Sequence, residues 1–448
     1  MNITREYLQE MQKKISGDRK PGEHFYAAFA GEESQFIRIN AAKVRQIGTV
    51  EDASMDITLI IESPNGDFRR ASRGCTLTGL SWKDWEELQD VFRILRFEVP
   101  QLPVDPYAKL PQDVGSSESQ TRGALLSWEE ASAKLLEPVQ KMDIAGIYAA
   151  GPVVRAMFNS AGLFHWFGTE TFSLDYSIYT STQRALKGTF AGTQWDSQAY
   201  MRELEAAQAR LVHLEKPARR VPRGAYRTYI APAGVHDLVG MLSWGGVSEA
   251  AMRQGDSPLR RMRTGERKMS PLFSLSEDFT GGVVPRFNDL GELAPELLPL
   301  ITRGELKNTL ISARTGKEYG LSSNGAGANE GLRSPVVAAG DLKEDQILDR
   351  LGTGLYLSNL HYLNWSDQPG GRITGMTRYA CFWVENGKIL APIENLRWDD
   401  SLFTLFGEKL EAVTAHRALE PEVGTYLARQ LGATLIPGML VSEMNFTL

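Results

Sequence analysis

The sequence predicts an α+β protein with an N-terminal α/β domain, a central mixed region and a C-terminal, barrel-like part rich in antiparallel strands. Helical spacing of apolar residues is confined to a few segments, such as 198–214. Most other apolar segments are short, rich in β-branched and aromatic residues, and separated by Gly-rich turns. Polar or proline-containing stretches divide the 448 residues into the ranges 1–105, 123–216 and 224–448.

The range 1–105 is expected to pack helices on a small, largely antiparallel sheet. Its apolar spacing predicts helices at 2–16 and 82–97, and strands at 25–29, 34–40 and 55–62. Asn65-Gly66 tolerates positive φ, so a hairpin turn is expected there. The following stretch, 102–122, contains Pro103, Pro106 and Pro111 and little periodic hydrophobicity, and is expected to be a linker.

The two later ranges are predicted to differ in their content of strand. The central range is expected to contain helices at 127–138 and 198–214, and strands at 144–149, 156–159 and 172–179. The last range is expected to contain helices at 235–244 and 341–351, the second opened by Asp341 and Glu344 as a capping pair. Its strands are predicted at 354–359, 377–385, 388–392 and 435–441.

Composition argues against several classes of partner. The formal net charge of -6 is small for this length, so no nucleic-acid partner is expected. No stretch approaches the roughly 20 apolar residues of a membrane span, and the N-terminus lacks the apolar segment of a signal peptide. Cys75 and Cys381 are the two cysteines, and the apolar run around Cys381 predicts a buried thiol. We expect a cytoplasmic protein with no membrane partner.

The one candidate catalytic segment is a predicted helix that begins near His236. A helical zinc peptidase needs two imidazoles about one turn apart and a carboxylate beside the first to take a proton from bound water. Asp237 supplies a carboxylate, one methylene shorter than glutamate, whereas Gly240 and Met241 stand where the second imidazole is needed. Taken alone, this segment predicts an amphipathic core helix that starts with a histidine. The sequence contains no phosphate-binding loop or nucleophile elbow of known pattern.

Several short segments, in order over about 350 residues, carry a resemblance to a known family. Among them are Phe-Ile-Arg-Ile-Asn at 36–40, Phe-Asn-Ser-Ala-Gly at 158–162, Ser-Pro-Leu at 257–259 and again at 270–272, and Val-Glu-Asn-Gly-Lys-Ile at 384–389. In their order and spacing the chain resembles the TldD/PmbA family of modulators and metallopeptidases.

The resemblance implies a chain that works as one of a pair. In the family, one chain carries a His-Glu-x-x-x-His motif and a C-terminal cysteine as zinc ligands and cuts unfolded or extended peptides. The other chain has lost these groups and serves as a structural, substrate-enclosing partner. Carried over by position, His236 matches the first histidine, Asp237 the glutamate and Met241 the second histidine. The segment 413–418, where the cysteine is expected, contains none.

These departures favour a zinc-free, non-catalytic subunit of a heterodimeric metallopeptidase that processes extended peptides. We then expect no catalytic residue and no cofactor in this chain, with zinc in a TldD-like paralogue; a second copy of this chain is the other possible partner. The segments 360–365 and 373–378 are unusual for the family's zinc-free chains and leave the pairing arrangement open. Two alternatives remain: an active metallopeptidase with ligands among His236, His361 and His416, and a peptide-binding scaffold without protease activity.

Overall fold

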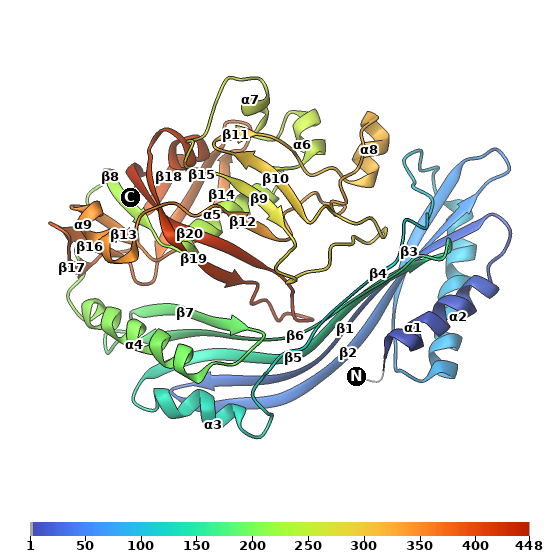
Figure 1. Cartoon of the computed structure of the whole chain (residues 1–448), viewed down its shortest axis with the longest axis horizontal. Helices are drawn as coiled ribbons and strands as arrows, with labels where there is room; N and C mark the ends of the chain where they lie inside the picture. The colour runs from blue at the N-terminus through green and yellow to red at the C-terminus, as the bar shows by residue number, and fades with distance from the viewer. Residues whose placement is uncertain (1–2, 448) are drawn as a thin grey trace.

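Two β-sheets face one another in the computed structural model, which describes residues 3–447 (Figure 1). The first sheet has seven strands, all from residues 23–192, and the second has thirteen, all from residue 224 onward. The predicted ranges 1–105 and 123–216 therefore contribute strands to one shared sheet. The predicted α+β class is confirmed.

The first sheet is built around four long antiparallel strands. They are β1 (Glu23–Asn40), β2 (Lys43–Glu62), β5 (Asp143–Asn159) and β6 (Phe164–Tyr179). The order is β3-β2-β1-β5-β6-β4, with β3 (Phe68–Thr76) and β4 (Ser117–Thr121) at the edges and β7 (Ala185–Gly192) paired with β6. The predicted turn at Asn65-Gly66 is confirmed, because it joins β2 to β3.

Two expectations for these strands were wrong, for the same physical reason. The segments 25–29 and 34–40 are one strand, β1, and the segments 144–149 and 156–159 are one strand, β5. Polar residues around Ser34 and the Gly151-Pro152 pair break the apolar pattern, although the backbone pairing continues on both sides of them. Part of the predicted linker is strand β4, whose polar residues pair with β6 through main-chain groups.

Four helices cover one face of the first sheet at its two ends (Figure 1). At one end α1 (Arg5–Gly17) and α2 (Ser81–Glu98) bury their apolar residues against β1, β2 and β5. At the other end lie α3 (Ala131–Leu136) and α4 (Ser197–Leu214). The helix α3 is shorter than the predicted 127–138: residues 127–130 form a turn before it, and from Glu137 the chain is 3₁₀ and contains Pro138.

Alternation along β5 divides its side chains between two environments. Val154 and Ala156 are buried in the core beneath α1 and α2. Arg155 and Met157 point to the opposite face, toward the second sheet. The cavity described below lies on that second face.

The second sheet is mostly antiparallel and does not close into a barrel. Its main path, β11-β10-β9-β12-β20-β8-β13-β16-β17, ends at two edges, and a branch through β18, β15 and β14 starts at β20. Within this second sheet, only the β12–β20 and β8–β13 pairs are parallel among the pairings of the described strands. The strands are β8 (Gly224–Ile230), β9 (Leu275–Asp278), β10 (Leu297–Thr302), β11 (Glu305–Leu306), β12 (Pro335–Val337), β13 (Gly354–Leu357), β14 (Asn359–Asp367), β15 (Arg372–Arg378), β16 (Phe382–Glu385), β17 (Lys388–Pro392), β18 (Arg397–Ser401), β19 (Leu410–Pro421) and β20 (Ala433–Phe446).

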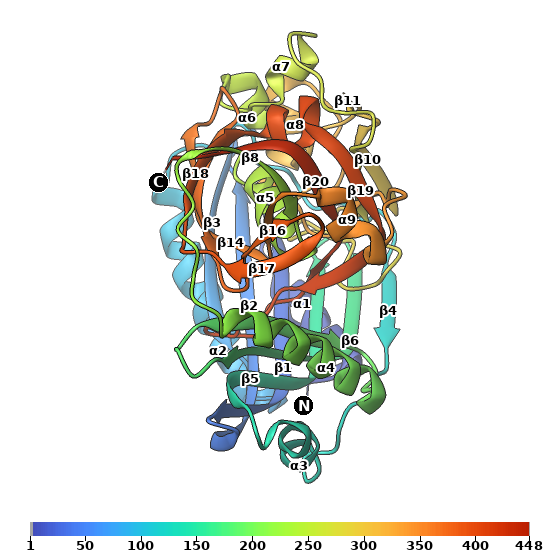
Figure 2. The same ribbon diagram turned by 90° about the vertical axis from the view of Figure 1, so that its left-hand side faces the viewer.

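The helix α5 (Pro232–Gly240) lies inside the C-terminal part, packed against β14, β19 and β20 (Figure 2). A 3₁₀ turn, Met241–Ser243, continues it, so the predicted helix at 235–244 is confirmed. The short helices α6 (Glu249–Gln254), α7 (Arg260–Arg263), α8 (Ala313–Tyr319) and α9 (Ile347–Leu351) lie outside the sheet. None of the helices within residues 3–447 is both long and apolar enough to cross a membrane.

The predicted capping pair Asp341 and Glu344 was wrong. The 3₁₀ turn Glu344–Gln346 precedes α9, and Lys343 occupies its N-cap position without a side-chain cap. Leu342 forms a bridge to Thr414 of β19, which keeps this part of the chain extended. A contact distant in sequence therefore overrides the local capping pattern.

Candidate functional site

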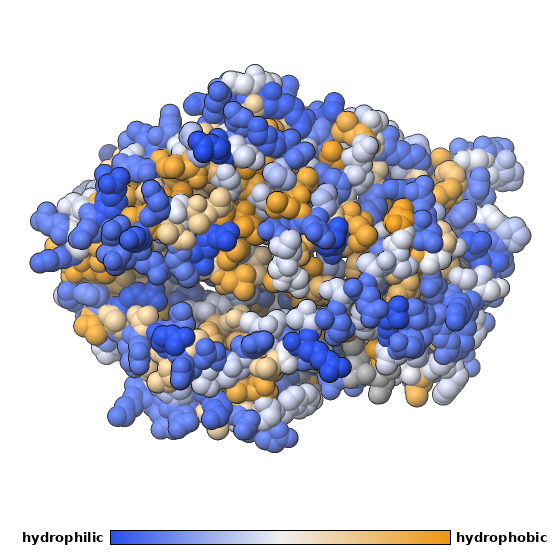
Figure 3. Space-filling model, in the orientation of Figure 1, coloured by the Kyte–Doolittle hydropathy of each residue, from blue (hydrophilic) through white to orange (hydrophobic). Residues whose placement is uncertain are grey.

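A cavity of about 1210 Å³ lies between the first sheet and the C-terminal part. One wall comes from β1 and β5, a second from α5 and β14, and a third from the turn between β19 and β20. The molecular surface is hollowed between these two parts (Figure 3). The volume exceeds the roughly 300–1,000 Å³ of ordinary small-molecule pockets, so a segment of extended chain fits better than a compact metabolite.

The helix α5 presents the candidate motif to this cavity. Val235, Leu238 and Val239 are fully buried in the core, and this fixes the rotation of the helix. His236 and Asp237 are half-buried and line the cavity. Met241 also borders the cavity, but only 3% of it is exposed and it belongs to the apolar core.

Asp237 is held by the main chain of β14. It accepts a hydrogen bond from the Leu360 N–H at 3.2 Å. Leu360 pairs with Thr377 of β15 at a position where the two residues do not hydrogen-bond to each other, since the Thr377 N–H donates to the Leu396 carbonyl. The Leu360 N–H therefore points away from β15. Burial raises the pKa of Asp237 to about 7, and the Leu360 hydrogen bond only partly opposes this rise. The carboxyl therefore joins α5 to β14.

The imidazole of His236 favours its neutral form and has a buried nitrogen without a partner. Burial lowers its pKa, and the nearby Glu422 carboxylate only partly opposes that shift. Its Nδ1 is buried and has no hydrogen-bond partner in the described part of the chain. A lone imidazole of this kind can accept a hydrogen bond from a group in the cavity.

The residues around His236 do not fit a zinc ion. Tetrahedral catalytic zinc takes three protein ligands and a water. Gly240 and Met241, one turn beyond His236, supply no imidazole, and Asp237 accepts a hydrogen bond from Leu360. Across residues 3–447, no group of three or more His, Cys, Asp or Glu side chains is placed to hold a metal ion.

The alternative histidine ligands are only partly brought together. His361, on β14, lines the same cavity as His236 and packs on Tyr362 with ring centroids 4.0 Å apart. His416, on β19, is exposed and is not among the residues that line the cavity. Thr414, in the segment where the family's cysteine is expected, is 2% exposed and receives the Gly438 N–H at 2.8 Å.

Three arginines that the sequence did not single out also line the cavity: Arg155, Arg333 and Arg429. Arg429 anchors the turn between β19 and β20, which reaches the first sheet in Figure 1. Its guanidinium donates to Ser34, to the Gly151 carbonyl and to both oxygens of Thr171. A smaller cavity of about 310 Å³ lies beside the same turn, and Arg429 borders both cavities. No local sequence pattern marks Arg429, because its partners are distant in the chain.

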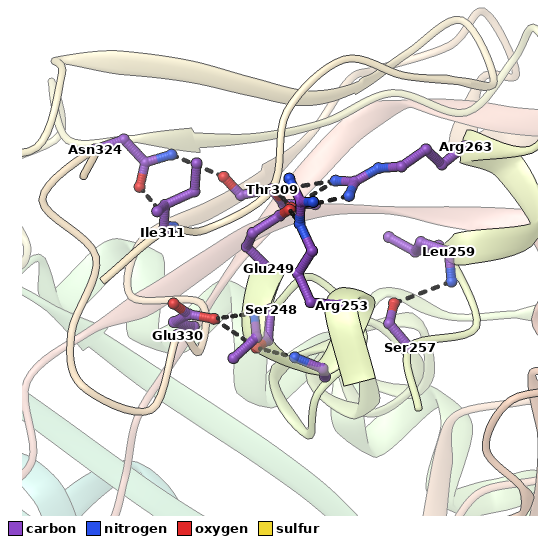
Figure 4. A network of polar contacts seen from close by, with 12 residues as sticks. Ser248, Glu249, Arg253, Ser257, Leu259, Arg263, Thr309, Ile311, Asn324 and Glu330 are labelled. Carbon is purple, nitrogen blue, oxygen red and sulfur yellow. Dashed lines mark hydrogen bonds and ion pairs between the residues drawn. The ribbon is translucent and has the colours of Figure 1, made fainter. Parts of the chain in front are cut away.

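A polar network fixes another wall of the cavity (Figure 4). Glu330, 1% exposed, accepts hydrogen bonds from the Ser248 hydroxyl at 2.6 Å, the Ala250 N–H at 2.9 Å and the Ser312 N–H at 2.7 Å. Ser248 and Ser312 are the N-caps of α6 and α8, so one carboxylate joins two helix starts. The segment that carries Glu330 also supplies lining residues such as Asn329 and Arg333.

Comparison with known proteins agrees with this geometry. Residues 223–448, half of the chain, match the family described as PmbA/TldA metallopeptidase C-terminal domain. TldE from Thermococcus kodakarensis superposes with a TM-score of 0.75 at 14% identity, over 99% of this chain and 100% of that one. A proposed modulator of a DNA gyrase from Thermotoga maritima superposes with a TM-score of 0.73 at 15% identity, over 99% and 100%.

A third solved structure, a proposed modulator of DNA gyrase from Bacteroides thetaiotaomicron, has a TM-score of 0.74 at 14% identity and covers 99% of this chain and 98% of its own. No curated protein sequence matches the chain. The fold and the family match define a metallopeptidase-related protein. The chain belongs to the PmbA/TldD family.

Proposed function

We propose that this chain is the zinc-free, non-catalytic subunit of a two-chain metallopeptidase. One observation carries the proposal: the helix α5 faces a large cavity with a single imidazole, and Met241 is buried where a second imidazole is needed. One histidine and one carboxyl supply at most two ligands, one short of the three protein ligands that a catalytic zinc takes. The zinc and the cleavage chemistry then belong to a TldD-like partner.

The role of this chain is to hold an extended peptide beside the partner's metal. The strand β14 pairs only with β15 among the described strands, and its residues 360–363 line the cavity. The Leu360 N–H is already donated to Asp237, so an extended peptide would add to this edge beyond Leu360, through main-chain hydrogen bonds that tolerate varied side chains. The cavity volume supports a peptide as the occupant.

The partner is proposed to be a related chain with an intact His-Glu-x-x-x-His motif. A second copy of this chain would bring no further imidazole at the Met241 position, so it would not supply the missing chemistry. Both cysteines are free thiols, Cys381 buried and Cys75 half-buried, which supports a reducing, cytoplasmic location.

A second candidate function is peptide binding without any protease partner. The cavity supports it, because a volume of about 1210 Å³ suits an extended peptide whether or not the peptide is cleaved. The third possibility, an active metallopeptidase with other ligands, has the weakest support, because His416 lies away from the cavity that His236 and His361 share.

Native mass spectrometry of the affinity-tagged chain, purified from its own cells under non-denaturing conditions, tests the leading proposal. The expected result is a complex with a paralogue that carries the intact motif, with zinc in the complex and none in this chain once the two are separated. A chain that purifies alone and retains stoichiometric zinc would overturn the proposal. A chain that purifies alone, zinc-free, and binds peptides would favour the scaffold instead.

A further inference from the structure

Arg155 is the one charged side chain that β5 contributes to the cavity lining. Its neighbours Val154 and Ala156 are buried beneath α1 and α2, so alternation directs Arg155 to the cavity face. Beside it, Ala28 and Met157 line the same face of the sheet. The guanidinium is therefore a half-buried cation that lines the same cavity as α5.

The hydrogen bonds of Arg155 leave much of its donor capacity unused. Its Nη1 donates to the Val154 carbonyl at 2.9 Å, and its Nη2 donates to the Arg429 carbonyl at 3.4 Å. A guanidinium carries five N–H groups, so these two bonds leave others for a ligand. Within residues 3–447, Arg155 forms no ion pair with a carboxylate.

The charges at this point of the cavity do not balance. Glu32, 3% exposed, is the acidic neighbour of both Arg155 and Arg429. Its Oε2 accepts from the Arg429 N–H at 3.2 Å and from the Ser34 hydroxyl at 3.2 Å. One buried carboxylate thus stands against two guanidiniums, and an uncompensated buried charge is unfavourable.

The other two cavity arginines are used by the fold. Arg429 makes four hydrogen bonds through its guanidinium to Ser34, Gly151 and Thr171. Arg333 donates to three main-chain carbonyls, stacks on Phe279 and lies near the buried carboxylate of Glu277. Arg155 is the arginine whose position and spare donors suit a ligand.

We propose that Arg155 binds a carboxylate carried by the peptide in the cavity, either an acidic side chain or the free C-terminus. This inference rests on the proposed peptide-holding function and assigns it a substrate preference. A carboxylate matches the fork of a guanidinium with two parallel hydrogen bonds and supplies the missing negative charge. Main-chain pairing at β14 would tolerate most sequences, and Arg155 would select among them and set the register.

Binding of matched fluorescent peptides to the full-length chain, followed by anisotropy, tests the assignment. One pair differs by Glu against Gln at a central position, with an amidated C-terminus. A second pair is neutral and differs only by a free against an amidated C-terminus. The wild-type chain is expected to bind the acidic member of at least one pair about 10–100-fold more tightly, the range of a charge-assisted hydrogen bond. The pair that shows the preference identifies the source of the carboxylate.

Variants separate the role of Arg155 from that of net charge. In Arg155→Gln the preference is expected to vanish while affinity for the neutral peptide stays within about twofold, whereas Arg155→Lys retains part of the preference. Arg220→Gln, at an exposed arginine far from the cavity lining, changes net charge equally and is expected to keep the full preference. Thermal unfolding of each variant shows whether it is folded. If Arg155→Gln does not fold, the reduced preference expected of Arg155→Lys tests the assignment instead.

Two results would overturn the inference: equal binding of both members of each pair by the wild-type chain, or an acidic preference that persists in Arg155→Gln. The same measurements on the complex with a zinc-bearing partner distinguish this failure from that of the proposed function. A complex that forms and binds peptides without acidic preference removes only the inference. A chain that binds no peptide, alone or paired, removes the peptide-holding role and the inference together.

Discussion

Asp237 has a structural partner at the position where a catalytic base would face a metal-bound water. Its carboxyl satisfies the N–H of Leu360, and burial raises its pKa to about 7. At the level of single residues, the altered motif is therefore part of the packing between α5 and β14.

Replacement of Asp237 is expected to change stability and leave catalysis by the complex unchanged. Asp237→Ala leaves a buried N–H unsatisfied and should lower the free energy of unfolding by about 1–3 kcal/mol. Asp237→Asn keeps an acceptor and should lose less. Urea unfolding measures both effects, and hydrogen exchange at the Leu360 amide should be faster in the alanine variant alone. A large fall in peptide cleavage by a complex containing a stably folded Asp237→Asn chain would contradict this role.

Glu249 shows how a buried carboxylate is stabilised away from the cavity (Figure 4). It is 2% exposed, and it accepts from Arg253 at 2.8 Å, Thr309 at 2.6 Å and Arg263 at 2.5 Å. Burial acts to raise its pKa, but the hydrogen bonds from Arg263, Thr309 and Arg253 outweigh it and lower the pKa to about 2. This carboxylate holds α6 and α7 against the segment around Thr309.

The lowered pKa of Glu249 predicts a pH-dependent contribution to stability. A group whose pKa is lowered on folding stabilises the protein above its unfolded pKa, and the contribution is lost as pH falls toward the folded value. Glu249→Gln should therefore lower the free energy of unfolding by about 2–3 kcal/mol at pH 7. The difference from wild type should shrink between pH 4.5 and pH 2. Urea titrations across this range test it, and a difference independent of pH would refute the assignment.

At the level of elements, α5 combines a core face with a cavity face. Val235, Leu238 and Val239 are fully buried, and Met241 extends that apolar face into the 3₁₀ turn. The position of the absent imidazole is therefore a core position in this chain. Restoring the metal motif would conflict with the packing.

The variant Met241→His is expected to lower stability and to gain no zinc, even when combined with Asp237→Glu. Burying an imidazole among apolar side chains should cost about 2–4 kcal/mol. A third ligand is still missing, so zinc should raise the melting temperature of neither variant. Met241→Leu is the matched control and should lose less than about 1.5 kcal/mol. Metal analysis after gel filtration completes the test, and stoichiometric zinc in the double variant would contradict it.

At the level of the whole molecule, the first sheet unites two segments that the sequence separates. The strand β1 pairs with β2 on one side and with β5 on the other. The core beneath α1 and α2 includes Phe158, Phe164 and Trp166 from the second segment. The early helices and strands therefore depend on residues beyond position 143 for their core.

Fragments of the chain should reflect this shared sheet. A fragment of residues 1–122 lacks β5 and β6, which leaves one edge of β1 unpaired and part of its core missing. It is expected to lack a cooperative thermal transition, because unpaired edges and exposed apolar residues favour aggregation. A fragment of residues 1–216 contains the whole first sheet and should show strand-type circular dichroism and resist limited proteolysis. Cooperative unfolding of 1–122 alone would show that this dependence is absent.

The fold was predictable where local pattern and tertiary environment agree. The helices α2 and α4 follow their apolar spacing to within one residue, and β17 lies at the predicted 388–392. The strand β4 was missed because its residues are polar and its stability comes from main-chain pairing with β6. The strand β1 was divided in two because the polar residues at its centre contact Arg429, which lies about 400 residues later in sequence.

Only part of the candidate site was predictable from the sequence, as was the case for the fold. His236, Asp237 and Met241 lie within six residues of the sequence, which shows directly that no second imidazole stands one turn beyond His236. Arg155, Arg429 and Glu330 carry no local signal, because each acquires its role from partners far along the chain. Sequence spacing could not show whether His236, His361 and His416 lie close together. Only the structure shows that His416 is not among the residues that line the cavity.

The sequence by itself determined the periodicity of its elements, the family resemblance and the absence of an imidazole one turn beyond His236. Each of these depends on residue types at short or fixed spacing, which the linear chain states directly. The tertiary structure alone decided that α5 faces a cavity, that Asp237 joins it to β14, and that Arg155 stands there with one carboxylate shared between two arginines. These features arise from contacts between distant segments, whose burial and charge no local pattern records.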